Sequence, residues 1–428
     1  MTDRKDDFLN DPAFMRGLTM RRMSRRDLFR SAGIGAGALS LGAILAACGG
    51  TSSGGSGGGG SDSTTGGIDW NAAPNGTLMF ANWPLYMDKK KVNGQVTYPS
   101  LDQFKTDTGI NVTYREAINS NPEFFGKIQP QLQAGQSTGW DIIVITNGPT
   151  LDQLLRLNYL VELPADKRPN FDANASVAVT SPAYDPGNKH TMAWQSGLTG
   201  IGWNPQLVKE LRPSNPTITK VMDLFDPAFK GKVGMFGDAQ DFPCLTMVGM
   251  GIDPATSTPE QWQQAADLLT KQKNDGIVRQ YYTQNYTNAL QNGDVALTMG
   301  WSGDIYQLNA EGDASGLQFC VPSEGSVIWT DNMCIPNGAE NPVDAITYMD
   351  YVYKPEIQAL IEDYVNYICP VPAAQDIIIN DLKDPTVGNS PLVFPSADDL
   401  SKTHVYYTFK SPDEEQQWNS LFQPIYQG

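Results

Sequence analysis

The run Asp141-Ile142-Ile143-Val144-Ile145 is almost wholly apolar, which is typical of a strand buried on both faces of a parallel sheet. Two shorter apolar runs precede it, at residues 78–80 and 112–114. Between these runs, apolar residues recur at helical spacing over residues 101–109 and 124–132. An order of strand, helix, strand, helix and strand predicts an α/β fold with a largely parallel sheet.

The same alternation continues beyond residue 204, with strand patterns at residues 233–236 and 295–300. The helical patterns of this part of the chain cover residues 260–273, 283–294, 302–310, 343–353 and 356–365. A chain of 428 residues is long enough for two α/β lobes, each with its own core.

The first 48 residues have the features of an export signal. Ser24-Arg25-Arg26-Asp27-Leu28-Phe29 follows the twin-arginine pattern, and residues 31–47 form an uncharged run rich in Gly and Ala. Leu45-Ala46-Ala47-Cys48 resembles a bacterial lipoprotein cleavage box. We therefore predict that residues 1–47 are a twin-arginine lipoprotein signal peptide and that Cys48 carries the lipid. An uncleaved N-terminal anchor is the alternative, and both interpretations place the protein outside the cytoplasmic membrane.

Residues 48–67 are predicted to be a flexible tether, because after Cys48 they consist almost entirely of Gly, Ser and Thr. Such a composition cannot bury a core. A tether between a lipid anchor and the folding part of the chain predicts a body held near a membrane, either on a cell surface or in a periplasm.

The charge of the mature chain makes nucleic acid an improbable partner. Residues 1–47 hold 8 of the 30 basic and 5 of the 47 acidic side chains, which leaves 22 basic against 42 acidic and a net charge of −20. A cationic ligand is compatible with this charge, although acidity of this size also confers solubility.

Metal and disulfide chemistry have little support in the sequence. The whole chain has two histidines, and its four remaining cysteines show no metal-binding spacing, so scattered buried thiols are the default interpretation. One or two disulfides among them would still be possible outside the cell. These cysteines are Cys244, Cys320, Cys334 and Cys369.

Ligands of open α/β sheets bind beyond the carboxyl ends of the strands. The strand ends of this chain hold four of its nine tryptophans, several carboxylates, and no Lys or Arg. They are Asn82-Trp83 with Tyr86, Thr146-Asn147, Trp194 with Ser196, Asp238 with Asp241, Trp301 with Asp304, Trp329 with Asp331, and Tyr367. Aromatic faces and unpaired carboxylates both attract ammonium groups, so the pattern predicts an acidic, aromatic-walled cleft for an organic cation.

Val327-Ile328-Trp329-Thr330-Asp331 is the clearest example of this pattern. In an extended segment, Trp329 and Asp331 lie on the same face, and no basic residue occurs between residues 312 and 353. A buried Trp beside a strand-ending surface Asp is the structural alternative.

The pair Asp238 and Asp241 allows three interpretations. If a helix begins at Gly237, their spacing of three places both carboxylates on one face, where they could bind a ligand. Helix capping is the second interpretation, since Pro243 suits a first helical turn. General acid and base catalysis is the third, although no nucleophile or metal-binding residue lies nearby in the sequence.

Taken together in their order and spacing, the motifs resemble the bacterial spermidine/putrescine-binding proteins, the extracellular receptors of polyamine ABC transporters. The matching segments, spread from Thr77 to Pro372, are Asn82-Trp83 with Tyr86, residues 140–144, residues 200–204, residues 238–241, Met299-Gly300-Trp301, residues 329–331 and residues 370–372. The resemblance implies a two-lobed periplasmic-binding-protein-like fold with hinge crossings and an interlobe ligand cleft. Lobe 1 would comprise residues 68–202 and 330–368, and lobe 2 residues 203–329 and 369–428.

The resemblance also implies roles for nine residues. Trp83, Tyr86, Trp301 and Trp329 would line the aliphatic chain of a polyamine, Asp238, Asp241 and Asp331 would bind its ammonium groups, and Thr146 would replace a serine that donates a polar contact. Near the third hinge crossing, Cys369 falls where the family has a tyrosine, and Tyr367 is a possible substitute.

Two further departures leave the length of the ligand open. Gly148 stands where the family often has an aromatic residue, and this removes one wall of the site. Asp241 is one methylene shorter than the usual Glu.

The sequence thus predicts a lipid-anchored monomer that binds putrescine or spermidine and delivers it to a membrane permease, without enzymatic activity, cofactor or metal. One alternative is a binding protein of the same fold for another small organic ligand, amino-acid-derived or a phosphonate. A less favoured alternative is an extracellular hydrolase that uses Asp238 and Asp241.

Overall fold

The computed structural model describes residues 67–92, 95–283, 285–310 and 316–427, which form one compact unit. The predicted signal peptide, the lipid-carrying Cys48 and all but the last residue of the predicted tether lie outside the described residues. In the part of the chain that is described, no helix combines the length and the apolar character needed to cross a membrane.

The first half of the sheet has the predicted strand and helix order. β1 (Thr77–Asn82) pairs in parallel with β4 (Asn111–Glu116) on one side and with β5 (Ile142–Thr146) on the other. The first four residues of β5 are fully buried, as its apolar run predicts. The helices of this half include α3 (Pro99–Thr108), α4 (Asn121–Gln133), α5 (Pro149–Arg156), α6 (Pro169–Asn174), α12 (Pro342–Tyr351) and α13 (Pro355–Val365).

The second half is also α/β. β7 (Val233–Phe236) pairs in parallel with β9 (Leu297–Trp301) and with β8 (Val278–Tyr282), a strand that was not predicted. Its helices include α7 (Pro205–Leu211), α8 (Asp241–Gly249), α9 (Pro259–Asn274), α10 (Tyr286–Gln291) and α11 (Ser302–Ala310).

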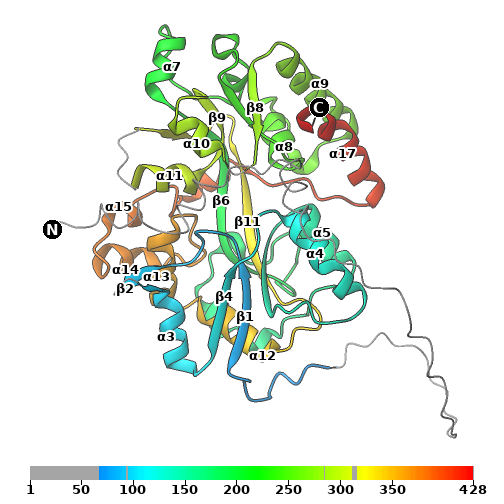
Figure 1. Cartoon of the computed structure of the whole chain (residues 1–428), viewed down its shortest axis with the longest axis vertical. Coiled ribbons are helices and arrows are strands. Elements are labelled where there is room, and N and C mark those ends of the chain that lie inside the picture. Colours follow the sequence, from blue (N-terminus) through cyan, green and yellow to red (C-terminus); the bar gives the residue numbers. More distant parts are fainter. Residues whose placement is uncertain (1–66, 93–94, 284, 311–315, 428) are drawn as a thin grey trace, which may run out of the picture. The chain divides into compact units, whose positions relative to one another are not determined.

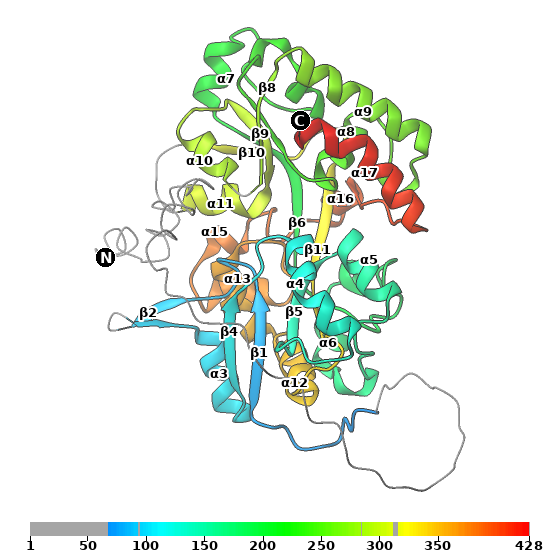
Figure 2. The same ribbon diagram turned by 45° about the vertical axis from the view of Figure 1, so that its right-hand side comes forward.

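Two long strands join these halves into one sheet of order β4-β1-β5-β11-β6-β9-β7-β8. β6 (Met192–Trp203) pairs antiparallel with β11 (Ser326–Cys334) over its first part, and antiparallel with β9 from Thr199 onward. The far end of β11 pairs with β5. Figures 1 and 2 show β6 and β11 running side by side from one half to the other.

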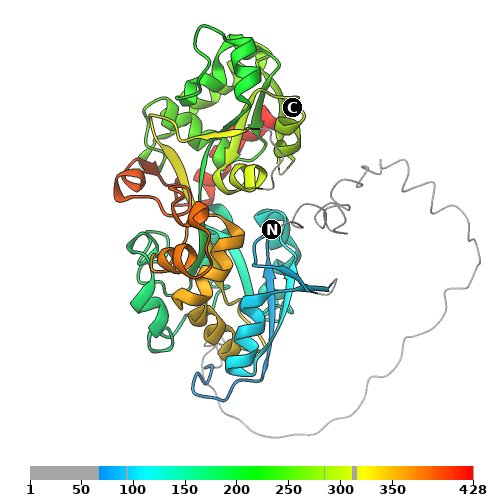
Figure 3. The same ribbon diagram turned by 90° about the vertical axis from the view of Figure 1, so that its left-hand side faces the viewer.

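The C-terminal part of the chain contacts both halves. α14 (Ala374–Asn380), α15 (Pro385–Gly388) and α16 (Ala397–Ser401) follow the last crossing, and two short edge strands are β10 (Gln318–Cys320) and β12 (Thr403–His404). α17 (Pro412–Gln427) then packs on α9 in the second half, where the rings of Trp262 and Trp418 lie 5.2 Å apart. Figure 3 shows this C-terminal segment, in red, within the second half. The residue boundaries of the two lobes remain a prediction.

Candidate functional site

Trp329 and Asp331 lie on β11 opposite Gly197 and Gln195 of β6. Gly197 is required here because the Trp329 indole lies directly over it. A Cβ atom at this position would be 2.3 Å from Trp329 Cζ2. The Trp329 ring therefore packs against Gly197 of the neighbouring strand. The residue is 7% exposed, and its Nε1 donates to Thr199 Oγ1 at 3.2 Å.

Asp331 is 5% exposed, and its carboxylate is bound by two hydroxyl groups. Tyr86 donates to Oδ2 at 2.8 Å. Thr146, which pairs with Asp331 from the neighbouring strand β5, donates to Oδ1 at 2.5 Å. Burial raises the pKa of Asp331 to about 6, although both hydrogen bonds oppose this shift. Thr146, which was predicted to contact the ligand, donates its hydroxyl group to Asp331, itself predicted to bind an ammonium group.

Asp241 is the first residue of α8 and is 6% exposed. Its Oδ1 accepts hydrogen bonds from Thr199 and Tyr406, both at 2.6 Å, and its Oδ2 accepts one from Trp301 Nε1 at 3.0 Å. Burial raises the pKa of this carboxyl group as well, against the effect of these three donors. Asp241 therefore resembles Asp331, since both are buried carboxylates held by neutral donors.

Asp238 differs from Asp241 because it lies in the loop before α8. Its Oδ1 accepts the backbone N–H groups of Gln240 and Asp241 at 2.7 and 2.6 Å. The helix begins at Asp241, so the expectation that a helix from Gly237 carries both carboxylates on one face is wrong. Burial, reinforced by the nearby charge of Asp241, raises the pKa of Asp238 to about 7.

An aromatic row connects the two buried carboxylates. The row begins at Trp301, which donates to Asp241. The ring centroids of Trp301 and Trp329 lie 6.4 Å apart, and those of Trp329 and Tyr367 lie 5.5 Å apart. A further 5.4 Å separates Tyr367 from Tyr86, which is the partner of Asp331. These contacts bring together residues from five separate stretches of sequence.

Trp83 and Trp194 occupy other positions. Trp83 is half-buried at the end of β1, and its Nε1 donates to the Val144 carbonyl at 3.1 Å. Among the described residues, no ring or hydrogen-bond contact joins Trp83 to the rest of the predicted site. Trp194 is a core residue, fully buried against Phe80.

The chain matches a known protein family over most of its length. Residues 100–394 match the family described as bacterial extracellular solute-binding protein, which is more than half of the chain. The chain belongs to this family of solute-binding proteins.

Individual relatives agree with the assignment. This solute-binding protein is 28% identical to the putrescine-binding periplasmic protein of Pseudomonas aeruginosa, over 78% of this chain and 88% of that protein. It is 25% identical to the spermidine/putrescine-binding periplasmic protein of Salmonella typhimurium, over 78% and 87% of the two chains. These relatives are named as binding proteins rather than as enzymes.

Solved structures confirm the predicted two-lobed fold. The spermidine/putrescine ABC transporter substrate-binding protein of Streptococcus pneumoniae superposes with a TM-score of 0.67 at 24% identity, over 82% of this chain and 98% of that one. The family description also agrees with the predicted location outside the cytoplasm.

Asp304 is a further carboxylate in the candidate site of this solute-binding protein, and it was absent from the nine predicted site residues. Its Oδ1 accepts a hydrogen bond from Tyr367 at 2.8 Å, and its Oδ2 accepts one from Tyr286 at 2.7 Å. Burial raises its pKa. Its position three residues after Trp301 was the available signal, but nothing in the sequence indicated that Tyr367 would reach it.

The position of Tyr367 supports its predicted role as substitute for the family tyrosine. Its ring lies over Gly303, where a Cβ atom would be 2.4 Å away, and it contacts both Trp329 and Tyr86. The Cys369 thiol instead donates to the Val371 carbonyl at 3.2 Å.

Gln240 fills the space that Gly148 leaves open. A Cβ atom on Gly148 would be 2.3 Å from Gln240 Nε2, which donates to the Asn147 carbonyl at 2.7 Å. The φ of 126° at Gly148 further restricts this position to glycine. The wall that the sequence predicts to be missing is therefore occupied by an amide from the opposite half of the sheet.

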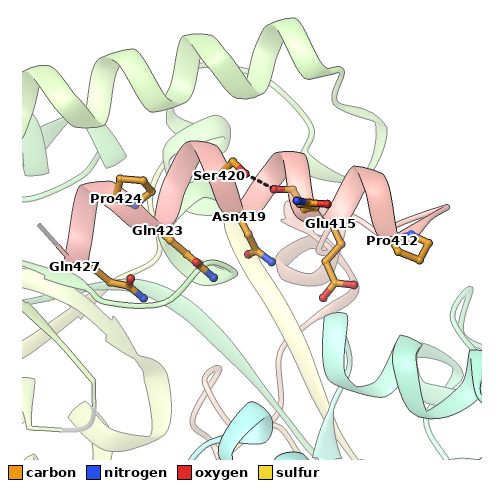
Figure 4. A pocket seen from close by; sticks show the side chains of 8 residues that line it. Pro412, Glu415, Asn419, Ser420, Gln423, Pro424 and Gln427 are labelled. Atoms are coloured by element: carbon orange, nitrogen blue, oxygen red, sulfur yellow. Dashed lines mark hydrogen bonds between the residues drawn. The ribbon is translucent and has the colours of Figure 1, made fainter.

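Other features carry no ligand assignment. All four cysteines of the body are free thiols, and no group of three His, Cys, Asp or Glu residues in the described part of the chain is placed to hold a metal. A depression of about 450 Å³ on α17 is lined by side chains of that single helix, which include Pro412, Glu415, Asn419 and Gln423 (Figure 4). One helix face does not enclose a small molecule.

The raised pKa values predict how the stability of the ligand-free protein depends on pH. Carboxyl groups of the unfolded chain titrate near pH 4, whereas the pKa is about 6 for folded Asp331 and about 7 for folded Asp238. The folded state therefore binds more protons between about pH 4 and 7, and stability falls as the pH rises through this window. We expect a higher melting temperature at pH 5 than at pH 7.5 by scanning calorimetry.

The variant Asp331→Asn provides the control for this prediction. It removes one of the titrating groups, so the difference in melting temperature between pH 5 and pH 7.5 should shrink. An unchanged difference would show that Asp331 does not titrate in this range.

Proposed function

We propose that this solute-binding protein is the receptor of an ABC importer, and that it binds a polyamine, putrescine or spermidine, as a monomer. The observation that carries the proposal is the continuous row from Asp241 through Trp301, Trp329, Tyr367 and Tyr86 to Asp331. A carboxylate stands at each end, with aromatic rings between.

This arrangement matches the chemistry of a diamine. Each ammonium group can form charge-assisted hydrogen bonds with a carboxylate, and the methylene chain between them can pack on aromatic faces. Among the described residues, the partners of Asp241, Asp304 and Asp331 are hydroxyl and indole groups, with no ion pair to Lys or Arg. The ligand would supply the positive charge. The names of the relatives from P. aeruginosa and S. typhimurium support the same class of ligand.

The two rival functions have less support. An anionic ligand such as a phosphonate calls for a basic residue, and none contacts these carboxylates in the described chain. A hydrolase would need Asp238 as an acid or base, whereas Asp238 accepts two backbone N–H groups at the start of α8. We propose that the protein binds its ligand without turnover.

Titration calorimetry with putrescine and with 1-butylamine tests the proposal. Butylamine has the same carbon chain but a single ammonium group, so we expect it to bind at least about 10-fold more weakly, since a charged hydrogen bond contributes about 1.5–3 kcal/mol. Glutamate should give no heat. Absence of binding to putrescine and spermidine at micromolar concentrations would refute the proposal.

Asp331→Asn should weaken putrescine binding by at least about 10-fold for the same reason. The melting temperature of the ligand-free variant at pH 7.5 should not fall, because the substitution removes a buried charge. Asp350→Asn is a matched control, since Asp350 is also buried and accepts bonds from Asn170 and Phe171 away from the site. It should leave putrescine binding unchanged. If Asp331→Asn also leaves putrescine binding unchanged, Asp331 has a structural role.

We also propose that ligand capture involves closure of the two halves, and that Gln240 stabilises the closed form. Asn147 follows β5 of the first half, and Gln240 precedes α8 of the second half. Their hydrogen bond would be made only when the halves approach, so its free energy would add to that of ligand binding.

Gln240→Leu should therefore weaken putrescine binding by about 2- to 10-fold, mainly through faster dissociation, because one neutral hydrogen bond contributes about 0.5–1.5 kcal/mol. Stopped-flow fluorescence measures the dissociation rate. Gln272→Leu is the matched control: Gln272 Nε2 donates to the Leu224 carbonyl at the same 2.7 Å, but both residues belong to the second half. Equal effects of the two variants would contradict a role in closure.

The membrane attachment predicted from the sequence is part of the proposed function. Twin-arginine export and lipidation of Cys48 would hold the receptor beside its permease. Cys48→Ser should release the exported protein from the membrane fraction into the soluble fraction, detected by immunoblot. Retention of this variant on membranes would rule out Cys48 as the anchor.

A further inference from the structure

A cavity of about 500 Å³ lies on the other face of the crossing strands. It is lined by Ile328 and Thr330 of β11 and by Ser196 of β6, which pairs with Thr330. Ile328 and Thr330 alternate along β11 with the site residues Trp329 and Asp331, so their side chains lie on the opposite face of the sheet. The hydroxyl groups of Ser196 and Thr330 are hydrogen-bonded to each other at 2.8 Å. The strand residues of this cavity therefore face away from Trp329 and Asp331. The cavity also borders the proposed polyamine site, because its lining includes Asn147, Gly148 and Tyr406, the last of which donates to Asp241.

The remaining walls are mostly apolar and come from distant parts of the chain. They include Val179, Tyr184, Val393, Phe394, Leu400 and Tyr407. A volume of this size is within the range of about 300–1,000 Å³ that is typical of small-molecule sites.

Asp152 is the only side chain of Asp, Glu, Lys, Arg or His among the described residues that line this cavity. It lies on α5, and its carboxylate makes no hydrogen bond or ion pair to a described residue; its Oδ2 is buried without a partner. Arg156, one turn further along α5, opposes the raised pKa of Asp152 through its charge, but its guanidinium group lies 3.8 Å from Glu415 of α17. A part-buried carboxylate without a hydrogen bond is energetically unfavourable, and a bound cation would reduce this cost.

We propose that this cavity is a second small-molecule site, for an organic cation with one ammonium group and an apolar body. The single carboxylate would bind the ammonium group, and the apolar walls would cover the body. A polyamine fits this site less well, because the lining offers no second carboxylate. This inference does not depend on the proposed polyamine function.

The test is titration calorimetry of the full chain with 2-phenylethylamine, which is protonated at neutral pH, and with 2-phenylethanol as its neutral counterpart. We expect saturable binding of one amine per chain and at least about 10-fold weaker binding of the alcohol. Asp152→Asn should remove most of this preference for the amine. Ala183→Trp, at an exposed position in the cavity lining, should block both probes.

The variant Asp331→Asn distinguishes this site from the polyamine site. Binding of 2-phenylethylamine should be unchanged in Asp331→Asn, whatever that variant does to putrescine. The inference is overturned if the amine gives no saturable binding, if amine and alcohol bind equally, or if the amine is lost in Asp331→Asn but kept in Ala183→Trp.

Discussion

The site depends on carboxylates that are buried without a cation. Transfer of a carboxylate from water into a protein is unfavourable unless hydrogen bonds or an opposite charge compensate. Around Asp241 and Asp331 the protein provides only neutral donors, from tyrosine, threonine and tryptophan side chains, and the pKa of both groups is raised. The compensation is therefore incomplete, and a ligand with ammonium groups would complete it.

The crossing strands give these carboxylates their positions. β11 carries Trp329 and Asp331, while β6 carries Gly197 beneath the indole and Thr199 beside Asp241. Because β11 pairs with β5 of the first half and β6 pairs with β9 of the second half, a shift between the halves would alter the site directly. The same strands form a wall of the second cavity with their opposite faces.

The sequence was most informative where local patterns determine structure. The apolar run that became β5, the helix that ends before Gly109 and the shared face of Trp329 and Asp331 all follow from side-chain periodicity. β8 was missed because its exposed Arg279 and Gln280 interrupt the apolar pattern. The predicted start of α8 is too early because Asp238 lies in the preceding loop, where its side chain accepts the backbone N–H groups of Gln240 and Asp241.

Long-range contacts were the part of the site that the sequence could not provide. Tyr406 reaches Asp241 across 165 positions of sequence, and Tyr367 reaches Asp304 across 63. Neither tyrosine has a neighbouring residue that marks its target. The general character of the site, aromatic and acidic, was nevertheless evident from the strand ends, because composition at those ends does not require knowledge of the individual contacts.

Gly148 and Gln240 have a consequence for how the ligand range of this receptor could change. An aromatic side chain cannot be introduced at position 148 while Gln240 keeps its place, because the two would overlap. Shortening Gln240 alone would leave a gap and an unpaired Asn147 carbonyl. Substitutions at the two positions are thus mutually dependent. Any evolutionary or engineered introduction of an aromatic residue at position 148 must also replace Gln240, and it must change the φ of 126° that the backbone adopts there.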